Sequence, residues 1–234
     1  IIGVEDNKPK AIALLKEMTA GDASIEVASL PAKYPQGAEK VLIYHTTGRV
    51  VPEGKLPADV GVIVMNVASV AFLSKYLKTG MPLTTKRVTV DGSAIAEPKN
   101  LLVPIGTPIQ NLIDFCGGFK TEPGKVLMGG PMMGIAVNRL DYPVLKNNNA
   151  ILAFDEKDSR EPEETPCIRC GRCVNACPMP ASIEKAFKAG NVDALRELKV
   201  NLCMECGCCA FACPAKRRLV MTNRLAKKML TQKK

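Results

Sequence analysis

The chain has 234 residues, of which 47% are hydrophobic and 24% charged, a balance typical of globular proteins and not of disordered ones. At roughly 100–150 residues per domain, this length suits one large domain or two to three small ones. Aromatic residues make up only 4% and tryptophan is absent, so a surface of stacked rings for single-stranded nucleic acid is disfavoured, and we expect no nucleic-acid partner.

The start of the chain and its hydropathy bear on location. The chain begins Ile1-Ile2-Gly3, as if within a strand, with no initiator Met and no charged segment before an apolar one, so we expect a fragment without a signal peptide. The longest apolar run, Val60–Leu73, is interrupted by polar residues and is shorter than the roughly 20 residues that span a bilayer. We therefore expect no transmembrane helix, and any membrane association to be peripheral.

Residues 1–83 alternate between the helical and the strand pattern, which favours an α/β layer. The predicted elements are a helix from Pro9 with Gly21 as its C-cap, a strand over Ser24–Leu30, a helix over Glu39–Thr47 stopped by Gly48, a buried strand over Val60–Met65, and a helix over Val67–Lys78 closed by Gly80.

Residues 84–158 change in character and predict a compact α+β unit of ubiquitin-like size. The predicted elements are strands at Arg87–Gly92, Asn100–Ile105, Lys125–Met128 and Ala150–Phe154, and a helix at Pro108–Cys116 capped by Thr107 and ended by Gly117 and Gly118. The glycine-rich stretch Gly129–Gly134 contains Pro131 and lacks the dinucleotide-binding spacing, so we interpret it as a tight turn. Ser159–Pro166 is interpreted as a linker.

Residues 159–234 contain an internal repeat of cysteines. Nine of the ten cysteines fall between Cys167 and Cys213. The run C-x2-C-x2-C-x3-C-P occurs twice with an offset of 36 residues, as Cys167, Cys170, Cys173, Cys177 and Pro178, and as Cys203, Cys206, Cys209, Cys213 and Pro214. Gly171 and Gly207 repeat as well. Two short helices, Ser182–Ala189 and Val192–Lys199, are predicted between the runs.

This doubled run is the pattern of two-cluster ferredoxins, in which the fourth cysteine of each run binds the other cluster. We therefore expect two [4Fe-4S] clusters with crosswise ligands. One cluster is assigned to Cys167, Cys170, Cys173 and Cys213, and the other to Cys203, Cys206, Cys209 and Cys177.

Other uses of the cysteines are disfavoured by their spacing. Structural zinc sites usually take two cysteine pairs separated by a longer loop, and disulfides belong to oxidising compartments. Cys208 does not preserve the offset of the repeat, so we interpret it as a packed thiol, with ligand exchange as the alternative. Cys116 stands alone beside Gly117 and is interpreted as a small buried hydrophobic residue.

Two further motifs, taken with the doubled cysteine run, carry a family resemblance. They are the loop Tyr34–Lys40 and the turn Gly129–Gly134. With these motifs the chain resembles, over essentially its whole length, the RnfC family, a component of the Rnf electron transport complex, which is a ferredoxin–NAD oxidoreductase. That family is similar to the flavin-binding, NADH-oxidising subunit of respiratory complex I.

The resemblance implies a fold of three parts. Residues 1–83 would be the C-terminal remainder of an α/β domain that binds FMN and NADH. Residues 84–158 would be an α+β soluble-ligand-binding β-grasp (SLBB-like) domain. Residues 159–234 would be a small, mainly α, ferredoxin-like domain with two [4Fe-4S] clusters and a basic C-terminal helix.

The resemblance also implies cofactors and their contacts. FMN is expected in the full-length protein, with NAD or NADH as substrate. Tyr34, Gly37 and Glu39 match a loop that contacts FMN in the flavin-binding protein of complex I, and Asn66 matches a strand-end asparagine that approaches FMN. The glycine-rich flavin loop of the family lies upstream of Ile1, so this fragment alone is not expected to be fully active.

The implied function is that of an electron-transfer subunit in a membrane-associated oxidoreductase complex, in which other subunits translocate an ion. Its expected partners are those subunits and a ferredoxin-type electron donor reached through one of them. Its expected location is peripheral, on the cytoplasmic face of a prokaryotic cell membrane. Two alternatives stay open: a cobalamin reductase of a bacterial microcompartment, and an electron-transfer module without catalysis of its own.

The C-terminal segment carries most of the net charge of +9, since residues 214–234 contribute +8. Apolar residues recur at near-helical spacing over Leu219–Leu230, with cations between them, which predicts an amphipathic basic helix. We expect its apolar side to pack on the cluster domain or a partner. We expect Arg224, Lys227 and Lys228 to face an acidic subunit or anionic headgroups, with part of the charge offsetting the clusters.

Overall fold

The computed structural model describes residues 1–178 and 183–232, which form two compact units. One unit combines Ile1–Val64 with Cys167–Lys234, and the other is Met65–Pro166. Three residues used in the predictions above, Ser182, Lys233 and Lys234, lie outside the described residues.

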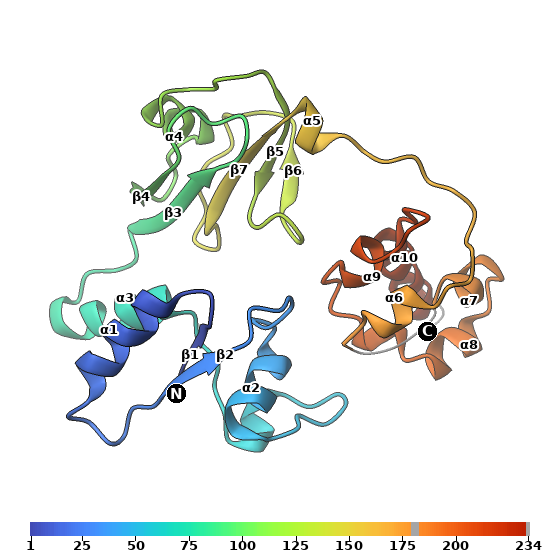
Figure 1. The fold of residues 1–234 in the computed structure, drawn as a ribbon, viewed down its shortest axis with the longest axis horizontal. Helices are drawn as coiled ribbons and strands as arrows, with labels where there is room; N and C mark the ends of the chain where they lie inside the picture. The colour runs from blue at the N-terminus through green and yellow to red at the C-terminus, as the bar shows by residue number, and fades with distance from the viewer. Residues whose placement is uncertain (179–182, 233–234) are drawn as a thin grey trace. The chain divides into compact units, whose positions relative to one another are not determined.

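The unit Met65–Pro166 is built on a five-stranded sheet in the order β4-β3-β7-β5-β6 (Figure 1). The strands are β3 Thr85–Asp91, β4 Lys99–Pro104, β5 Pro123–Met128, β6 Ile135–Val137 and β7 Ala150–Asp155. β3 and β7 pair in parallel, with Val90 opposite Ile151, while β4, β5 and β6 join by antiparallel pairing. This arrangement confirms the predicted β-grasp type of α+β fold. The short β6 was not predicted.

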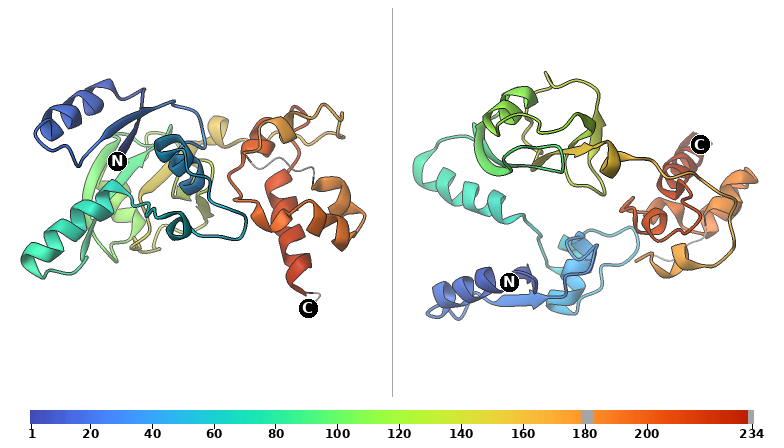
Figure 2. Two further views of the ribbon diagram at one scale, coloured as in Figure 1. Left: turned by 90° about the horizontal axis from the view of Figure 1, so that it is seen from below. Right: turned by 45° about the horizontal axis from the view of Figure 1, so that its top comes forward.

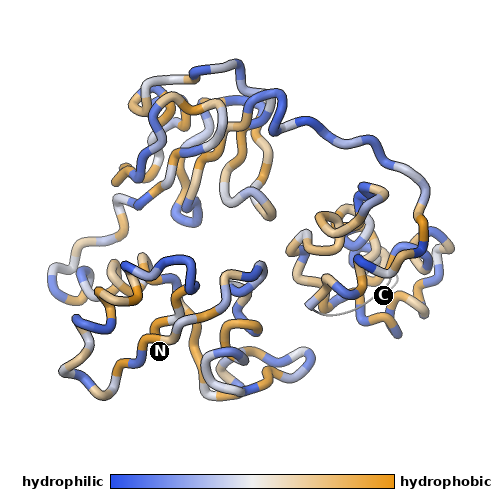
Figure 3. Tube along the Cα trace, viewed as in Figure 1, coloured by the Kyte–Doolittle hydropathy of each residue, from blue (hydrophilic) through white to orange (hydrophobic). Residues whose placement is uncertain are grey.

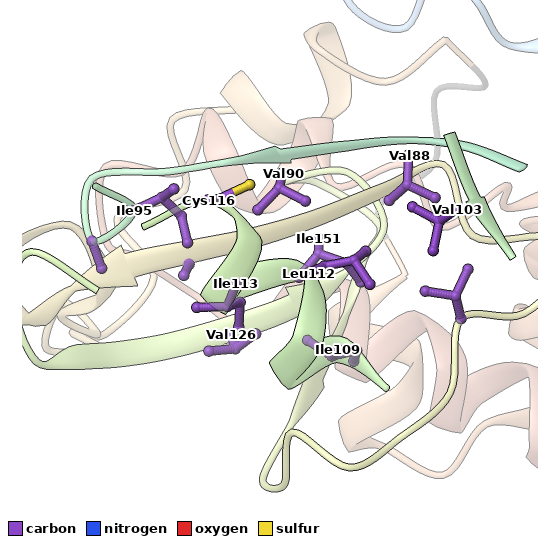
Figure 4. Close-up of a cluster of buried hydrophobic side chains, with 13 residues drawn as sticks. Val88, Val90, Ile95, Val103, Ile109, Leu112, Ile113, Cys116, Val126 and Ile151 are labelled. Carbon is purple, nitrogen blue, oxygen red and sulfur yellow. The ribbon is translucent and has the colours of Figure 1, made fainter. Parts of the chain in front are cut away.

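Helix α4, Ile109–Phe115, covers this sheet and completes its core (Figure 4). Six large apolar side chains of the helix and of β3 and β7 are at most 2% exposed; they are Val88, Val90, Ile109, Leu112, Ile113 and Ile151. Each fully buried side chain of this kind contributes about 1.5–3 kcal/mol. Cys116 is fully buried in the same cluster, which confirms its interpretation as a small core residue.

The turn between β5 and β6 is tight. The Gly134 N–H donates to the Gly130 carbonyl at 2.7 Å, and a Cβ on Gly134 would lie 2.5 Å from that oxygen. Gly129 has a φ of 109°, in the region that favours glycine. The backbone therefore closes on itself here, in agreement with the prediction of a tight turn.

Helices α3 and α5 mark the ends of this unit. α3, Val67–Thr79, begins with Asn66 as its N-cap, and Gly80 at φ 67° closes it, as predicted. α5, Glu156–Ser159, is followed by residues 160–166, which have no helix or strand and are mostly hydrophilic (Figure 3). This agrees with the predicted linker.

In the other unit, β1 Ile2–Glu5 and β2 Val27–Leu30 pair in parallel, and α1 Pro9–Thr19 packs beside β2 (Figure 2). They are followed by α2 Glu39–Thr47 and the 3-10 turn η1 Pro57–Val60. Gly48 adopts φ 69° and ends α2, as predicted.

Three local predictions are wrong. Val60–Met65 is not a strand: Val60 ends the 3-10 turn η1, residues 61–66 form no helix or strand, and Ile63 is 81% exposed, so the run is not buried as a core strand would be. Gly21 is not the C-cap of α1, because the helix ends one residue earlier, at Ala20 in the right-handed region. Thr107 does not cap α4, because its hydroxyl donates back to the Pro104 carbonyl.

The cysteine-rich part of this unit is small and mainly helical, as predicted. Its elements are α6 Arg172–Asn175, α7 Glu184–Lys188, α8 Val192–Glu197, η2 Val200–Leu202, α9 Cys208–Phe211 and α10 Leu219–Gln232. α10 packs against α7, α8 and η2 around a core of Ile183, Ala186, Leu195, Val200 and Ala226 (Figures 1 and 2). Its apolar stripe therefore packs within the chain, as expected of an amphipathic helix.

Candidate iron-sulfur centres

The two cysteine runs fold into equivalent loops. Arg169 and Glu205, 36 residues apart, have φ values of 57° and 58°, and Gly171 and Gly207 have 74° and 88°. A non-glycine residue in the left-handed region carries a strain of roughly 1–3 kcal/mol, which recurs at functional sites. A four-residue helix, α6 or α9, then follows each loop at the same offset. The repeat in sequence is thus a repeat in backbone conformation.

The first four predicted ligands lie around one cavity. Cys167, Cys170, Cys173 and Cys213 all line a cavity of about 620 Å³. Cys213 reaches it from the second run, as crosswise ligation requires. Cys167 and Cys170 are exposed, whereas Cys213 is buried.

The other four predicted ligands also lie together. Cys177, Cys203, Cys206 and Cys209 line a small cavity of about 20 Å³, and Cys177 reaches it from the first run. Three of them, Cys177, Cys203 and Cys209, also line a neighbouring cavity of about 460 Å³. None of the four is exposed, and Cys206 is buried. Cys208 is buried too and does not line either cavity.

The donor chemistry of both quartets fits iron–sulfur clusters. Thiolates are the ligands that such clusters prefer, and N–H groups that point at the sulfurs stabilise them. The Arg169 N–H donates to Cys167 Sγ, and Asn223 Nδ2 donates to Cys203 Sγ, each at 3.4 Å. Among the described residues, no group of three or more His, Cys, Asp or Glu side chains is placed to hold a single metal ion.

Burial raises the pKa of three thiols in the cysteine-rich part. Burial raises the pKa of Cys209 to about 11 against the opposing effect of the Ala210 N–H. Burial and a hydrogen bond with Cys206 raise the pKa of Cys208 to about 11, and burial also raises the pKa of Cys173. Because cluster ligands are thiolates, cluster assembly releases protons from the ligands among these groups.

A buried ion pair borders the first cavity. Arg217 Nε donates to Glu184 Oε1 at 3.0 Å, and these side chains are only 15% and 16% exposed. Lys188 adds a second cation at 2.9 Å. Burial alone would raise the pKa of Glu184, but the hydrogen bonds from Arg217 and Lys188 hold it below its ordinary value. The pair joins α7 to the segment that follows Cys213.

Two ion pairs join helix α10 to the second loop. Arg224 Nε and Lys227 Nζ contact the Glu205 carboxylate at 2.7 and 2.9 Å. The hydrogen bond from Lys227, followed by that from Arg224, lowers the pKa of Glu205, although burial acts in the opposite direction. Arg224 and Lys227 are thus paired with an acid of this chain, and the expectation that they also face an acidic subunit or anionic headgroups stays a prediction. Lys228 is exposed on the same helix.

The residues matched to an FMN loop are divided between the two units. Tyr34 is half-exposed, and its hydroxyl donates to the Cys206 carbonyl at 2.6 Å. Gly37 and Glu39 follow in the same loop, both exposed, with Glu39 as the first residue of α2. Asn66 belongs to the other unit, where its Oδ1 accepts from the Ala68 N–H. Their contacts with FMN stay predictions.

The Tyr34–Glu39 loop contains one buried amide with an unsatisfied group. Gln36 is 3% exposed and its Oε1 meets His45 Nδ1 at 2.9 Å. Within residues 1–178 and 183–232, Gln36 Nε2 has no hydrogen-bond partner. A buried donor of this kind usually has an acceptor, so it suits a polar group from outside the chain, such as one of FMN.

Family models cover most of the chain. Residues 1–75 match the Nuo51 FMN-binding domain, residues 87–136 the SLBB domain, and residues 166–217 the 4Fe-4S dicluster domain. The order of these matches confirms the predicted fold class of a flavin-type, a β-grasp and a two-cluster part.

Curated relatives agree, and all three named here are RnfC proteins. The chain is 49% identical, over 85% of its length, to the RnfC protein of the proton-translocating ferredoxin:NAD(+) oxidoreductase complex of Clostridium ljungdahlii. It is 47% identical, over 97% of its length, to the RnfC protein of the Na(+)-translocating complex of Acetobacterium woodii, and 40% identical over 82% to that of the ion-translocating oxidoreductase complex of Rhodobacter capsulatus. The chain is thus similar to these RnfC proteins over most of its own length. It spans 43%, 52% and 38% of these relatives, about half their length or less. The matches give no support to the corrinoid-reductase alternative.

Sequence reasoning missed two residues that act on the second site, Asn223 and Glu205. Asn223 lies four residues after Leu219 and three before Ala226, on the buried stripe of α10. A polar residue at a core-facing position of an amphipathic helix was the available signal. Glu205 gave no comparable signal, because its partners are 19 and 22 residues away along the chain.

Proposed function

We propose that this chain is the electron-transfer subunit of an ion-translocating ferredoxin:NAD(+) oxidoreductase complex, relaying electrons between two [4Fe-4S] clusters and a flavin/NAD site. The observation that carries the proposal is the placement of eight cysteines in two quartets, each completed by a cysteine from the other run. Similarity to the RnfC proteins of such complexes over most of the chain supports the same conclusion.

The ligands follow from the quartets. Cys167, Cys170, Cys173 and Cys213 would hold one cluster, and Cys177, Cys203, Cys206 and Cys209 the other. Each cluster, when bound, supplies reversible one-electron chemistry at low potential. The chain itself supplies thiolates, loops of fixed backbone, and N–H donors aimed at two of the sulfurs.

The flavin contact would involve the loop around Tyr34, Gly37 and Glu39, with Asn66 as a further contact. The unsatisfied Gln36 Nε2 in that loop supports this assignment. Tyr34 also bonds to the backbone of Cys206, so the loop proposed to contact FMN touches the second quartet directly. We assign the flavin-binding part to residues 1–83, the β-grasp domain to 84–158, and the two-cluster domain to 159–234.

The proposed partners are the other subunits of the complex and a ferredoxin-type donor reached through one of them. The proposed location is peripheral, on the cytoplasmic face of a prokaryotic cell membrane. Among the described residues, no helix has both the length and the apolar character needed to cross a bilayer.

The test uses the full-length protein, purified anaerobically with its clusters. We expect bound FMN, seen as flavin released on denaturation, and reduction of the clusters on rapid mixing with NADH. Protein with intact clusters that binds no FMN and does not oxidise NADH would refute the proposal. Cluster reduction by a low-potential donor without any turnover of NADH would select an electron-transfer module without its own catalysis.

A further inference from the structure

Asn223 is one of the few polar side chains buried in the described part of the chain, with 9% exposure. It lies on the inner side of α10, in the stripe formed by Leu219, Ala226 and Leu230. A buried amide on an apolar stripe costs free energy unless it is hydrogen-bonded. Its partner therefore indicates why an asparagine stands here.

That partner is a predicted cluster ligand. Asn223 Nδ2 lies 3.4 Å from Cys203 Sγ, and Asn223 lines both cavities beside the second quartet. A thiolate has no proton and can only accept a hydrogen bond. Of the two polar ends of the amide, the N–H end is the one that a cluster-bound Cys203 would attract.

At the position equivalent to Asn223 in the repeat, the first site has no such donor. The residue 36 positions before Asn223 is Phe187 on α7, just as Ile183 precedes Leu219 by 36 positions. Phe187 has no hydrogen-bond donor in its side chain and packs in the cluster of Ile183, Ala186 and Leu195. At the first site the donor to Cys167 is instead the backbone N–H of Arg169, in the loop itself.

We propose that Asn223 is a positioning residue that raises the reduction potential of the cluster at the second quartet, and so sets the two clusters apart in energy. The inference rests on the proposed function in that both clusters must be bound. Adding one electron changes the charge of a cluster with its four thiolates from about −2 to about −3. The positive end of the Asn223 N–H dipole, held against Cys203 Sγ, stabilises the more negative state.

The acidic side chain of the second loop does not cancel this effect. Glu205, in the second loop, is paired with Arg224 and Lys227. Its negative charge is thus balanced locally, which leaves the amide dipole as an oriented group in direct contact with a ligand sulfur. Hydrogen bonds to the sulfurs are among the factors that set cluster potentials.

The test is a redox titration of anaerobically purified, cluster-loaded protein, followed by EPR, with Asn223→Leu compared with wild type. Leucine keeps the size and the helix but removes the donor. At a fixed solution potential, the ratio of reduced to oxidised second cluster should fall by about two- to tenfold, the effect of one hydrogen bond. A tenfold change is about 59 mV for a one-electron couple.

Two controls make the result specific. The first cluster in the same molecule should keep its potential. Thr222→Ala changes the adjacent residue of α10, whose hydroxyl bonds to the Arg218 carbonyl of its own helix, and should move neither potential. Asn223→Asp, which replaces the donor by a negative charge, should lower the potential of the second cluster further than leucine does.

Equal potentials in wild type, Asn223→Leu and Asn223→Asp, with about eight iron per chain in each, would overturn the inference. If both variants lose the second cluster, the hydrogen bond is tested in wild-type protein that is labelled with 15N only at asparagine side chains. Pulsed EPR of its reduced second cluster should then show a 15N coupling, and its absence would also overturn the inference. Wild-type protein without about eight iron would contradict the proposed function instead.

Discussion

Arg169 and Glu205 occupy equivalent positions in the two cysteine loops and share nearly the same backbone angles, but their surroundings differ. Arg169 stands on an exposed loop beside two exposed cysteines. Glu205 is held by two cations of α10, beside a quartet with no exposed cysteine. The repeat thus sets the ligand loops, while the element that follows each run sets the environment.

The elements that follow the two runs differ in length. α7 has five residues and α10 has fourteen. The longer helix brings Asn223, Arg224 and Lys227 to the second loop. Burial and hydrogen bonding are means by which a protein tunes a metal centre after its ligands are fixed. Two sites with one ligand pattern can therefore differ in potential and in stability.

The largest expected effect comes from breaking the crosswise ligation. Cys177→Ser removes a ligand from the quartet of Cys203, Cys206 and Cys209, and leaves the quartet of Cys167 complete. We expect about half of the iron to be lost, and the EPR signal of the second cluster to be lost with it. Iron analysis and EPR measure both.

Cys208→Ala is the matched control for this change, because Cys208 is a buried cysteine of the same loop outside both quartets. It should keep about eight iron per chain. Selective loss of the first cluster in Cys177→Ser would show local instead of crosswise ligation. Loss of iron in Cys208→Ala would show that Cys208 is a cluster ligand.

The ion pair beside the first site should matter more for stability than the one beside the second. Glu184→Gln removes the Glu184 carboxylate from its contact with Arg217 in a mostly buried position, at a cost of about 1–3 kcal/mol. Since the pKa of Glu184 is lowered, its contribution is present at neutral pH and is lost as the pH falls through that pKa. Thermal unfolding at several pH values measures this.

The difference between wild type and Glu184→Gln should accordingly shrink on acidification. Asp193→Asn, which breaks an exposed pair with Arg196, is the control and should cost less than about 0.5 kcal/mol. A difference that grows as the pH falls would contradict the assigned role of Glu184.

The left-handed backbone of the loops gives the next effect. Gly171 has a φ of 74°, and open space surrounds the position of a Cβ, so Gly171→Ala should cost roughly 1–2 kcal/mol through backbone strain alone. Gly21→Ala, also in open space but at an ordinary φ, should be neutral or slightly stabilising. Equal thermal stabilities of the two variants would show that the loop does not require this conformation.

The smallest effect concerns the charges of α10. Arg224→Gln with Lys227→Gln removes both partners of Glu205, and should destabilise the second cluster site by about 0.2–1 kcal/mol per pair, less at high salt. Lys228→Gln, an exposed cation of the same helix, should have no effect. The rate of cluster loss in air, followed by absorbance, compares them. An equal effect of Lys228→Gln would show that net charge matters and pairing does not.

Much of the fold and of the two cysteine sites was predictable from the sequence, because it depends on local sequence patterns. The cysteine spacing predicted the two quartets that the structure brings together, and Gly48 and Gly80 ended helices where expected. Their ligand roles stay predictions. What failed depended on contacts with distant parts of the chain: Val60–Met65 has the composition of a strand but joins neither sheet, and Glu205 is held by a helix that follows it in the chain.

We propose above all that the chain holds two [4Fe-4S] clusters in its two cysteine quartets. Metal and sulfide analysis of protein purified anaerobically tests it most directly. We expect about eight iron and eight sulfide per chain, and an EPR signal of two interacting clusters on reduction. Zinc at a stoichiometric level in place of iron, without sulfide, would contradict it.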